Sequence, residues 1–332
     1  MSHIEFLAIG DIVTEPFIRL TDAHVAPGVN PESKEICMRF GDKIPYEYAV
    51  HAVAVGNASN AAVAASRLGL PASLRSYVGD DRYGTECIEV LQKEGVDTSL
   101  MVTEAGKITN YHFVLWYGSE RTILVKHEEF AYTVPELSES PKWIYLSSLA
   151  ENSLPYHEAL VALLEAHPET KLVFQPGTFQ MKIGKEALAP LYARSELFFS
   201  NKEEAQRILE LPEEHDIKVL LEEIHALGPK IVVITDGREG AYAYDGARKL
   251  HVPMYPDTRP PFERTGAGDA FSATVAVALA LGYPLDQALL WGPINSMSVV
   301  QEVGAQKGLL TREALDAYLK DAPPEYTLTE LN

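Results

Sequence analysis

The most informative segment of this 332-residue chain reads Glu263-Arg264-Thr265-Gly266-Ala267-Gly268-Asp269-Ala270-Phe271. It leads into the apolar run 272–281, which Gly282 and Pro284 close, so the sequence predicts a buried helix that begins near the two glycines. Free backbone N–H groups at the start of such a helix favour an anion. A carboxylate is poorly placed there to hold a phosphate but well placed to take a proton from a hydroxyl that attacks one. The segment therefore predicts an anion hole beside a general base, as phosphoryl transfer requires.

The overall composition argues against several classes of partner. The 28 basic and 47 acidic side chains give a net charge of −19, which argues against a protein that binds a nucleic-acid backbone. Cys37 and Cys87 stand far apart in no metal-binding pattern, as expected for reduced thiols in the cytosol. The N-terminus lacks the basic flank of a signal peptide, and the run 272–281 is too short to span a bilayer. We therefore expect a cytoplasmic protein without nucleic-acid or membrane partners.

Short apolar strands alternate with helices along most of the chain. Continuous apolar runs such as 231–234 suit parallel strands that are buried on both faces. The predicted strands lie at 6–9, 72–78, 100–103, 143–146, 171–174, 196–199 and 231–234. The predicted helices lie at 60–68, 82–94, 155–165, 185–192, 202–210, 215–227, 268–281, 286–300 and 312–320. This order predicts one doubly wound α/β domain over residues 1–332, with a mostly parallel sheet flanked by helices.

Two regions depart from this alternation. Residues 111–117 and 121–125 are rich in aromatic and β-branched side chains and flank Gly118-Ser119-Glu120, which predicts a β-hairpin. Residues near 12–55 are irregular, with short β-like pieces such as 36–40. We expect these regions, about 12–55 and 108–128, to form a small discontinuous β-lid. The tail from Ala322 onward is expected to be loosely held.

Two further motifs follow predicted strands. Thr235-Asp236-Gly237-Arg238-Glu239-Gly240 comes directly after the strand 231–234. Taken alone it is a strand-turn-strand connection, but its glycines would also let backbone amides approach a nucleotide phosphate. Asn201-Lys202-Glu203-Glu204 follows the strand 196–199 and has the spacing of a helix N-cap. Asn201 and Glu204 could also orient waters bound to a metal, and the two roles are compatible.

A fourth group lies near the N-terminus. Gly56 opens a tight turn into a helix in Val55-Gly56-Asn57-Ala58-Ser59-Asn60, and Asp11 ends the first strand. Asn57, Asn60 and Asp11 carry the amide and carboxylate groups that suit sugar hydroxyls, although each alone is more often a turn or cap residue.

Together these groups resemble the PfkB (ribokinase-like) family of carbohydrate and nucleoside kinases, from Asp11 to about Gly304. The family's C-terminal signature, Asp-Thr-x-Gly-Ala-Gly-Asp, is met at Gly266-Ala267-Gly268-Asp269. Its Asn-x-x-Glu motif falls on Asn201 and Glu204, and its Thr-x-Gly-x-x-Gly loop falls on Thr235, Gly237 and Gly240. Its N-terminal pattern of glycines, an asparagine and a small residue appears as Gly56, Asn60, Ala62, Gly69 and Gly79. The resemblance implies a ribokinase-like fold and an ATP-dependent kinase with an alcohol group as acceptor.

The resemblance also implies a role for each matching residue. Asp269 would be the base, and the amides of Gly266, Ala267 and Gly268 would form the anion hole. Asn201 and Glu204 would organise Mg²⁺ through its waters. Nucleotide contacts would come from Thr235, Gly237, Gly240 and, near the adenine, Asn295. Substrate hydroxyls would be held by Asp11, Gly56, Asn57 and Asn60. In this family the β-lid often pairs with a second lid, which implies a homodimer.

Three departures from the family pattern bear on the activity. The usual Asp-Thr or Asp-Ser is Glu263-Arg264 here, which argues against activation by a monovalent cation such as K⁺. Arg264 either lies near the phosphates or faces solvent. The paired glycine of sugar-specific members is Val55-Gly56, and the lysine that often follows is Asn57, so sugar contacts are not preserved intact.

We therefore expect a kinase that phosphorylates a sugar hydroxyl. A nucleoside acceptor is the nearest alternative, because the aromatic residues 111–117 could stack on a base. A non-catalytic regulator that binds a sugar or nucleotide on the same fold is a second alternative, against which the intact Asp269 argues.

Overall fold

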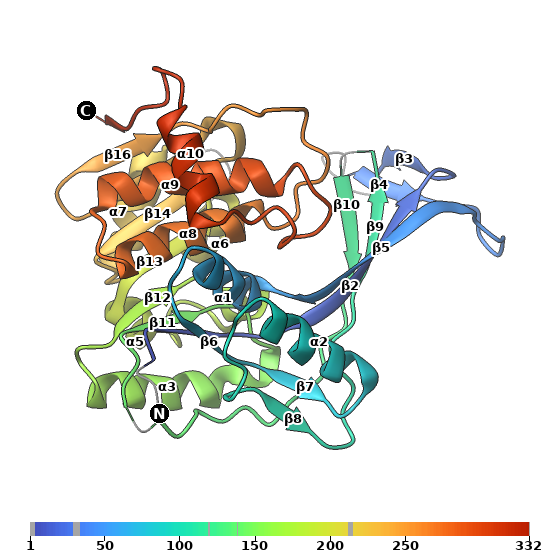
Figure 1. Ribbon diagram of the computed structural model, residues 1–332, viewed down its shortest axis with the longest axis horizontal. Coiled ribbons are helices and arrows are strands. Elements are labelled where there is room, and N and C mark those ends of the chain that lie inside the picture. Colours follow the sequence, from blue (N-terminus) through green and yellow to red (C-terminus); the bar gives the residue numbers. More distant parts are fainter. Residues whose placement is uncertain (1–3, 29–33, 119, 138, 212–214, 332) are drawn as a thin grey trace.

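A nine-stranded sheet forms the centre of the computed structural model, which describes residues 4–28, 34–118, 120–137, 139–211 and 215–331 (Figure 1). The strand order is β17-β16-β15-β14-β13-β12-β11-β1-β6. Pairing is parallel from β6 to β14 and antiparallel from β14 to β17. The strands are β1 (Phe6–Ile9), β6 (Ala72–Arg75), β11 (Trp143–Leu146), β12 (Lys171–Phe174), β13 (Ser195–Asn201), β14 (Ile231–Thr235), β15 (Ala241–Tyr244), β16 (Lys249–Val252) and β17 (Thr329–Glu330). The predicted doubly wound, mostly parallel α/β fold is confirmed.

Successive side chains of each central strand enter different cores, because a strand points alternate residues to opposite faces. Phe6 and Ala8 pack into the core that is covered by α1, α8 and α9, whereas Leu7 and Ile9 pack into the core that is covered by α3, α5, α6 and α7. The first group of helices comprises α1 (Asn57–Arg67), α8 (Ala267–Ala280) and α9 (Leu285–Val299). The second comprises α3 (Leu154–Ala166), α5 (Ala189–Arg194), α6 (Lys202–Leu209) and α7 (Ile217–Ala226).

The parallel strands end at one edge, where ligands bind in open α/β sheets. Asn201 at the end of β13 lies in register with Thr235 at the end of β14. Gln175 follows β12, and Asp11 comes two residues after the end of β1. The polar residues that the sequence placed after strands therefore collect at this edge.

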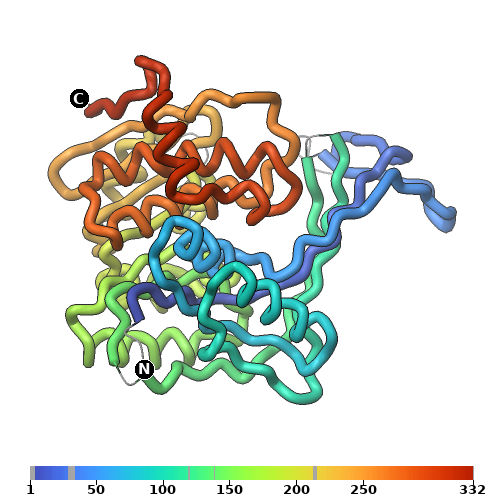
Figure 2. The backbone as a smooth tube through the Cα atoms, viewed as in Figure 1, coloured from blue at the N-terminus to red at the C-terminus, as the bar shows by residue number. Residues whose placement is uncertain are grey.

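A four-stranded sheet in the order β10-β9-β2-β5 projects from the same edge (Figures 1 and 2). Its strands are β2 (Val13–Leu20), β5 (Tyr46–Val55), β9 (Phe113–Tyr117) and β10 (Glu120–Leu124). The predicted hairpin is confirmed as the antiparallel pair of β9 and β10. The sequence did not predict β2 and β5 as strands, because Glu15 and Pro16 interrupt the apolar residues of β2 and half of β5 is exposed.

Smaller elements complete the described chain. These are β3 (His24–Pro27), β4 (Lys34–Cys37), β7 (Tyr77–Gly79), α2 (Arg82–Lys93), β8 (Val102–Glu104), α4 (Thr178–Ile183) and α10 (Arg312–Lys320), with single 3₁₀ turns at Glu151–Ser153 and Gly237–Glu239. Among the helices of the described ranges, none combines the length and the apolar character that crossing a membrane requires.

Two local predictions were wrong. The expected strand 72–78 is divided between β6 of the large sheet and β7, which pairs instead with β8. The tail is not loosely held, because β17 pairs with β16 and the buried Tyr326 donates a hydrogen bond to the carbonyl oxygen of Leu290. A short strand pair and one buried ring are enough to fix the chain there.

Candidate active site

Gly266 ends the loop before α8 in a conformation that suits glycine. Its φ of 81° lies in the left-handed region, and a Cβ at this position would come 2.3 Å from the Cβ of Ala305. The glycine turn directs the chain into α8, where Asp269 lies in the first turn. A Cβ on Gly268 would meet open space. The helix N-terminus is therefore accessible to a ligand.

The carboxylate of Asp269 is held by two amide side chains. Nδ2 of Asn60 donates to Oδ2 (2.8 Å), and Nε2 of Gln175 donates to Oδ1 (3.2 Å). Asn60 is itself oriented by Gln306, whose Nε2 donates to Oδ1 of Asn60 (3.0 Å) and to the carbonyl oxygen of Ala54 (2.7 Å). Burial raises the pKa of Asp269, and the hydrogen bonds from Asn60 and Gln175 oppose this shift.

A cavity of about 340 Å³, here called the polar pocket, surrounds this carboxylate. It lies between the helix α1, the edge of the large sheet and the four-stranded sheet. Polar side chains that line it are Glu15, Asn57, Asn60, Arg121, Gln175, Asn201, Glu204, Arg264 and Asp269. Gly56, Gly266, Gly268 and Thr235 also line it. Residues from four separate predicted motifs are thus brought together.

Asn201 and Glu204 form a reciprocal cap at the start of α6. Oδ1 of Asn201 accepts from the backbone N–H of Glu204 (2.8 Å), and Oε2 of Glu204 accepts from the backbone N–H of Asn201 (2.9 Å). The predicted capping is confirmed. Burial raises the pKa of Glu204, and the nearby charge of Asp269 acts in the same direction. Within the described residues, His, Cys, Asp and Glu side chains form no group of three that could hold a metal ion.

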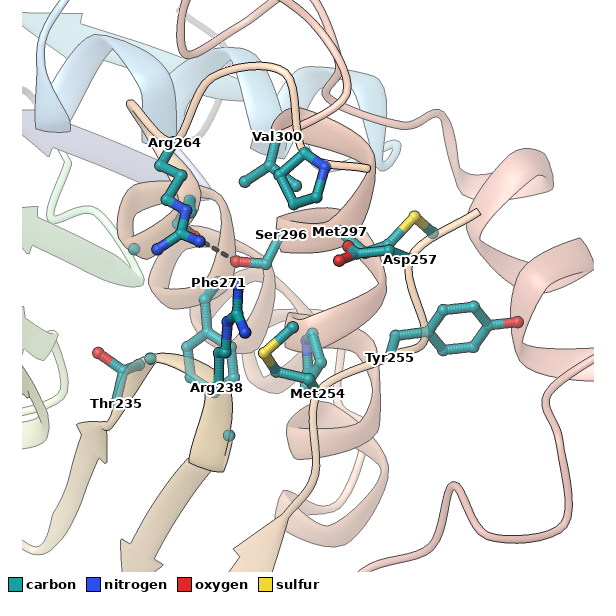
Figure 3. A pocket seen from close by; sticks show the side chains of 16 residues that line it. Thr235, Arg238, Met254, Tyr255, Asp257, Arg264, Phe271, Ser296, Met297 and Val300 are labelled. Atoms are coloured by element: carbon teal, nitrogen blue, oxygen red, sulfur yellow. Dashed lines mark hydrogen bonds between the residues drawn. The ribbon is translucent and has the colours of Figure 1, made fainter. Parts of the chain in front are cut away.

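A second cavity of about 210 Å³, here called the apolar pocket, adjoins the polar pocket at the start of α8 (Figure 3). Its walls include Met254, Phe271, Pro293, Met297 and Val300. The loop after β14 contributes Thr235, Gly237, Arg238 and Gly240. Gly240 has a φ of 89°, and a Cβ there would come 2.2 Å from the carbonyl oxygen of Val252. Thr235, Arg264 and Gly268 line both pockets.

Sequence comparison identifies the family. A model described as "pfkB family carbohydrate kinase" matches residues 29–312. The chain belongs to the pfkB family. It is 29% identical over 279 residues to ribokinase of Bacillus subtilis, covering 80% of this chain and 87% of that protein. It is 25% identical over 281 residues to 5-dehydro-2-deoxygluconokinase of Halalkalibacterium halodurans (80% and 85% covered) and 25% identical over 260 residues to nucleoside kinase of Methanothermobacter thermautotrophicus (76% and 80% covered).

Solved structures share the fold of this pfkB-family chain. A putative ribokinase from Agrobacterium tumefaciens superposes with a TM-score of 0.77 at 21% identity, covering 96% of this chain and 98% of that one. Arabidopsis thaliana ribokinase, complexed with ribose and ATP, gives a TM-score of 0.75 at 18% identity, with 96% and 99% covered. The family match and the sequence relatives make the protein a phosphotransferase with an alcohol group as acceptor, from an ATP-dependent kinase family that acts on small molecules.

Asn295, which the family resemblance placed near the adenine, is not among the residues that line the apolar pocket. Its side chain is fully buried between helices, where Nδ2 donates to Oγ1 of Thr274 (2.7 Å) and Oδ1 accepts from the backbone N–H of Leu310 (2.9 Å). The next residue on α9, Ser296, lines the apolar pocket instead and donates a hydrogen bond to the carbonyl oxygen of Ala267 (dashed line in Figure 3). Because neighbours on a helix differ by about 100° in direction, a shift of one residue changes the face.

Asp11 lies beside the polar pocket of this kinase but does not line it. Its carboxylate accepts from the hydroxyl of Tyr132 at 2.8 and 2.9 Å, and Nδ1 of His127 is 3.5 Å from Oδ2. The backbone of Asp11 packs against Gly56, where a Cβ would come 2.6 Å from the Asp11 carbonyl oxygen. Of the predicted substrate contacts, Gly56, Asn57 and Asn60 reach the pocket directly.

Three side chains of the site were not among the predicted site residues. Gln175 was recognised only as part of a polar loop, and a single amide after a strand gives no stronger signal. Glu15 belongs to β2, which the sequence did not predict; it is buried, with Nδ1 of His112 3.5 Å from Oε1. Arg121 belongs to the predicted hairpin. The alternation of side chains along a strand indicates which residues share a face of the sheet, but not which part of the protein that face contacts.

Proposed function

We propose that this pfkB-family kinase transfers the γ-phosphoryl group of ATP to a hydroxyl group of a sugar. The proposal is based on the position of Asp269. Two amide side chains hold its carboxylate in the polar pocket, and the preceding residue, Gly268, lines both the polar and the apolar pocket. The apolar pocket would take the adenine of ATP, and the glycine loop after β14 would lie along its phosphates. The polar pocket would hold the acceptor.

In this proposal Asp269 acts as the general base. Its carboxylate takes the proton of the acceptor hydroxyl while that oxygen attacks the γ-phosphorus. The bond to the β,γ-bridging oxygen breaks, and ADP leaves with that oxygen. Backbone N–H groups of Gly266, Ala267 and Gly268 and the N-terminus of α8 stabilise the charge on the transferring group. Arg264 lines both pockets and would add a guanidinium beside the same phosphoryl group.

Mg²⁺ would bind near Asn201 and Glu204. Oδ1 of Asn201 and Oε2 of Glu204 accept hydrogen bonds in the helix cap, so Oε1 of Glu204 is the oxygen left outside the cap, which suits contact through a metal-bound water. When bound, the ion would neutralise charge on the nucleotide phosphates. Activation by K⁺ is not part of the proposal, because Oε1 of the buried Glu263 already accepts hydrogen bonds from the backbone N–H (2.7 Å) and the hydroxyl of Thr265.

Sugar is favoured over nucleoside by the aromatic contacts. Tyr111 packs against Tyr83 and Phe113, with ring centroids 4.7 and 5.3 Å apart, and Trp116 packs against Phe262 at 5.1 Å. None of these five aromatic side chains is among the residues that line the described polar pocket. Seven of the side chains that do line it are amides or carboxylates, which bind hydroxyl groups.

The four-stranded sheet would act as a lid on the acceptor. Glu15 from β2 and Arg121 and Ile123 from β10 line the polar pocket, so the sheet forms one wall of it. The rest of the chain would form the single ribokinase-like domain that carries this lid. Figure 1 shows the sheet reaching well away from the helices, as a movable cover would.

The decisive test of this function replaces the base. With MgATP and a panel of sugars and nucleosides, Asp269→Asn is expected to lower kcat by about 10²- to 10⁴-fold, because proton abstraction is lost, while nucleotide affinity is retained. Asp286→Asn, in the first turn of α9 and outside both pockets, is the matched control. Turnover that survives in Asp269→Asn would show that the base is assigned wrongly. Saturable binding without any ATP consumption by the wild type would favour the non-catalytic regulator.

A further inference from the structure

Three guanidinium groups line the two pockets, and their positions differ. Arg238 lines the apolar pocket, Arg264 lines both pockets, and Arg121 lines the polar pocket alone. In the described part of the chain, none of the three side chains donates a hydrogen bond. Arg238 and Arg264 extend toward the same space beside Ser296, in the apolar pocket (Figure 3). These two side chains therefore suit the phosphates of ATP, whereas Arg121 has no ligand group assigned to it.

Arg121 is placed on the acceptor side by the register of the hairpin. It lies opposite Trp116 on β9, and Ile123 lies opposite Val114, so these four residues share the inward face of the sheet. Arg121 and Ile123 both line the polar pocket. Nε of Arg121 is shielded from solvent and has no hydrogen-bond partner among the described residues. Its nearest ion-pair contact is Oε1 of Glu263 at 3.9 Å, which is too long for a hydrogen bond.

The carboxylates that line the polar pocket, by contrast, already have partners. Asp269 accepts from Asn60 and Gln175, and Glu204 accepts from the backbone N–H of Asn201. Glu15 faces His112 at 3.5 Å. Because the Arg121 side chain keeps 31% of its surface exposed and donates no hydrogen bond to a described residue, its guanidinium is available to a ligand in the pocket. Among the described residues, Arg121 therefore has no hydrogen-bonded anionic partner on the acceptor side of the pocket, although the carboxylate of Glu263 lies 3.9 Å away.

On these grounds we propose that the acceptor carries an anionic group, a carboxylate or a phosphate, which Arg121 binds while the amide side chains bind its hydroxyls. The proposal rests on the kinase function proposed above and names the class of its acceptor. A planar guanidinium suits either group, because both can accept two parallel N–H bonds. An acidic protein can still select an anion by such a local contact, and the lid would bring the contact to the substrate as it closes.

Matched acceptors test the proposal. Wild-type enzyme is assayed with MgATP on ribose, ribonate and ribose 5-phosphate, and on glucose, gluconate and glucose 6-phosphate. At least one acid or phosphate should exceed its neutral parent in kcat/KM by roughly 10- to 100-fold, as expected for a charged hydrogen-bonded pair. The sugar acids and the sugar phosphates form separate arms, so the result also tells which anion is bound. A neutral sugar preferred in both series overturns the proposal and leaves the kinase function standing.

Variants show whether Arg121 is responsible. Arg121→Gln should raise the KM of the anionic acceptor by roughly 10- to 100-fold while the KM of MgATP stays unchanged, and Arg121→Lys should recover part of the loss. Arg82→Gln, exposed at the start of α2, removes the same charge outside the pocket and should change neither constant. A fall in kcat with every acceptor, neutral ones included, would instead place Arg121 on the phosphoryl group and overturn the proposal.

Binding separates this inference from the kinase function. If no acceptor in the panel is phosphorylated, the proposed function fails, and calorimetric titration with gluconate and with ribose 5-phosphate still decides the inference. Saturable binding that Arg121→Gln weakens supports an anion site in the polar pocket. Equal binding by wild type and Arg121→Gln, or no binding to either anion, overturns it.

Discussion

Asp269 is held in place by residues that lie far from it in the sequence. Its two amide donors come from α1 and from the end of β12, and the Asn60 amide is oriented in turn by Gln306. Both donors stabilise the ionised carboxylate, whereas burial acts against ionisation and wins. A base that is hydrogen-bonded yet more basic than an ordinary aspartate suits abstraction of a proton from an alcohol.

The direction of that shift predicts the pH dependence of the reaction. Only the ionised form of Asp269 can accept a proton, so kcat/KM should fall as pH drops through its pKa. Because burial raises the pKa of Asp269, the acid limb of the profile should lie above about 4, the ordinary value for aspartate. A pH–rate profile with saturating MgATP measures it. The limb should vanish from the residual activity of Asp269→Asn, and a limb that persists there would belong to another group.

The residues that could be predicted from sequence are those in contiguous motifs. The turn Gly266–Asp269 and the cap Asn201–Glu204 could be predicted, because the start of a helix favours particular residues at fixed neighbouring positions. The direction of Asn295 could not be predicted, because α9 is apolar on nearly every face and its sequence therefore does not show which face a residue lies on. Gln175 and Arg121 could not be assigned, because their roles depend on which elements meet at the end of a strand.

The helix α6 contributes to this site in two ways, through the stability of its own N-terminus and through the side chains that it places in the polar pocket. Its N-cap pair satisfies backbone groups at the helix start and also lines the polar pocket. The central strands were predictable because burial on both faces makes them continuously apolar. The strands β2 and β5 were not, because Glu15 and Pro16 interrupt the apolar residues of the buried β2, and half of β5 is exposed. The lid was therefore predicted from its hairpin and from the irregular pattern of residues 12–55, without its two longer strands.

Replacing the cap of α6 separates the two tasks. Asn201→Ala should lower the free energy of unfolding by about 1 kcal/mol through loss of the cap. It should also raise the Mg²⁺ concentration needed for half-maximal activity, if Asn201 orients waters on the ion. Thr311→Ala is the control, because Oγ1 of Thr311 caps α10 by accepting from the backbone N–H of Ala314 (3.4 Å) and lines neither pocket. Equal Mg²⁺ dependence in both variants would leave Asn201 with capping alone.

At the scale of the whole molecule, the outer face of the four-stranded sheet is unusually apolar for a protein with a net charge of −19. Phe113 and Leu124 lie directly opposite each other on β9 and β10, with 44% and 53% of their surfaces exposed. Val125 is 56% exposed next to Leu124. Arg121 and Ile123 point the other way, into the polar pocket. An exposed apolar face behind a pocket wall is typical of a contact surface.

We predict that this face pairs with the same face of a second copy, as the family resemblance implies, since a two-fold contact buries one patch against itself. Light scattering after gel filtration should give about twice the chain mass of 36.6 kDa. Leu124→Glu places a charge in the middle of the patch and should give a monomer with a higher KM for the acceptor, because the lid loses its support. Val219→Glu adds the same charge at an exposed position on α7, outside this sheet, and should stay dimeric. A wild-type monomer, or a Leu124→Glu dimer, would refute the pairing.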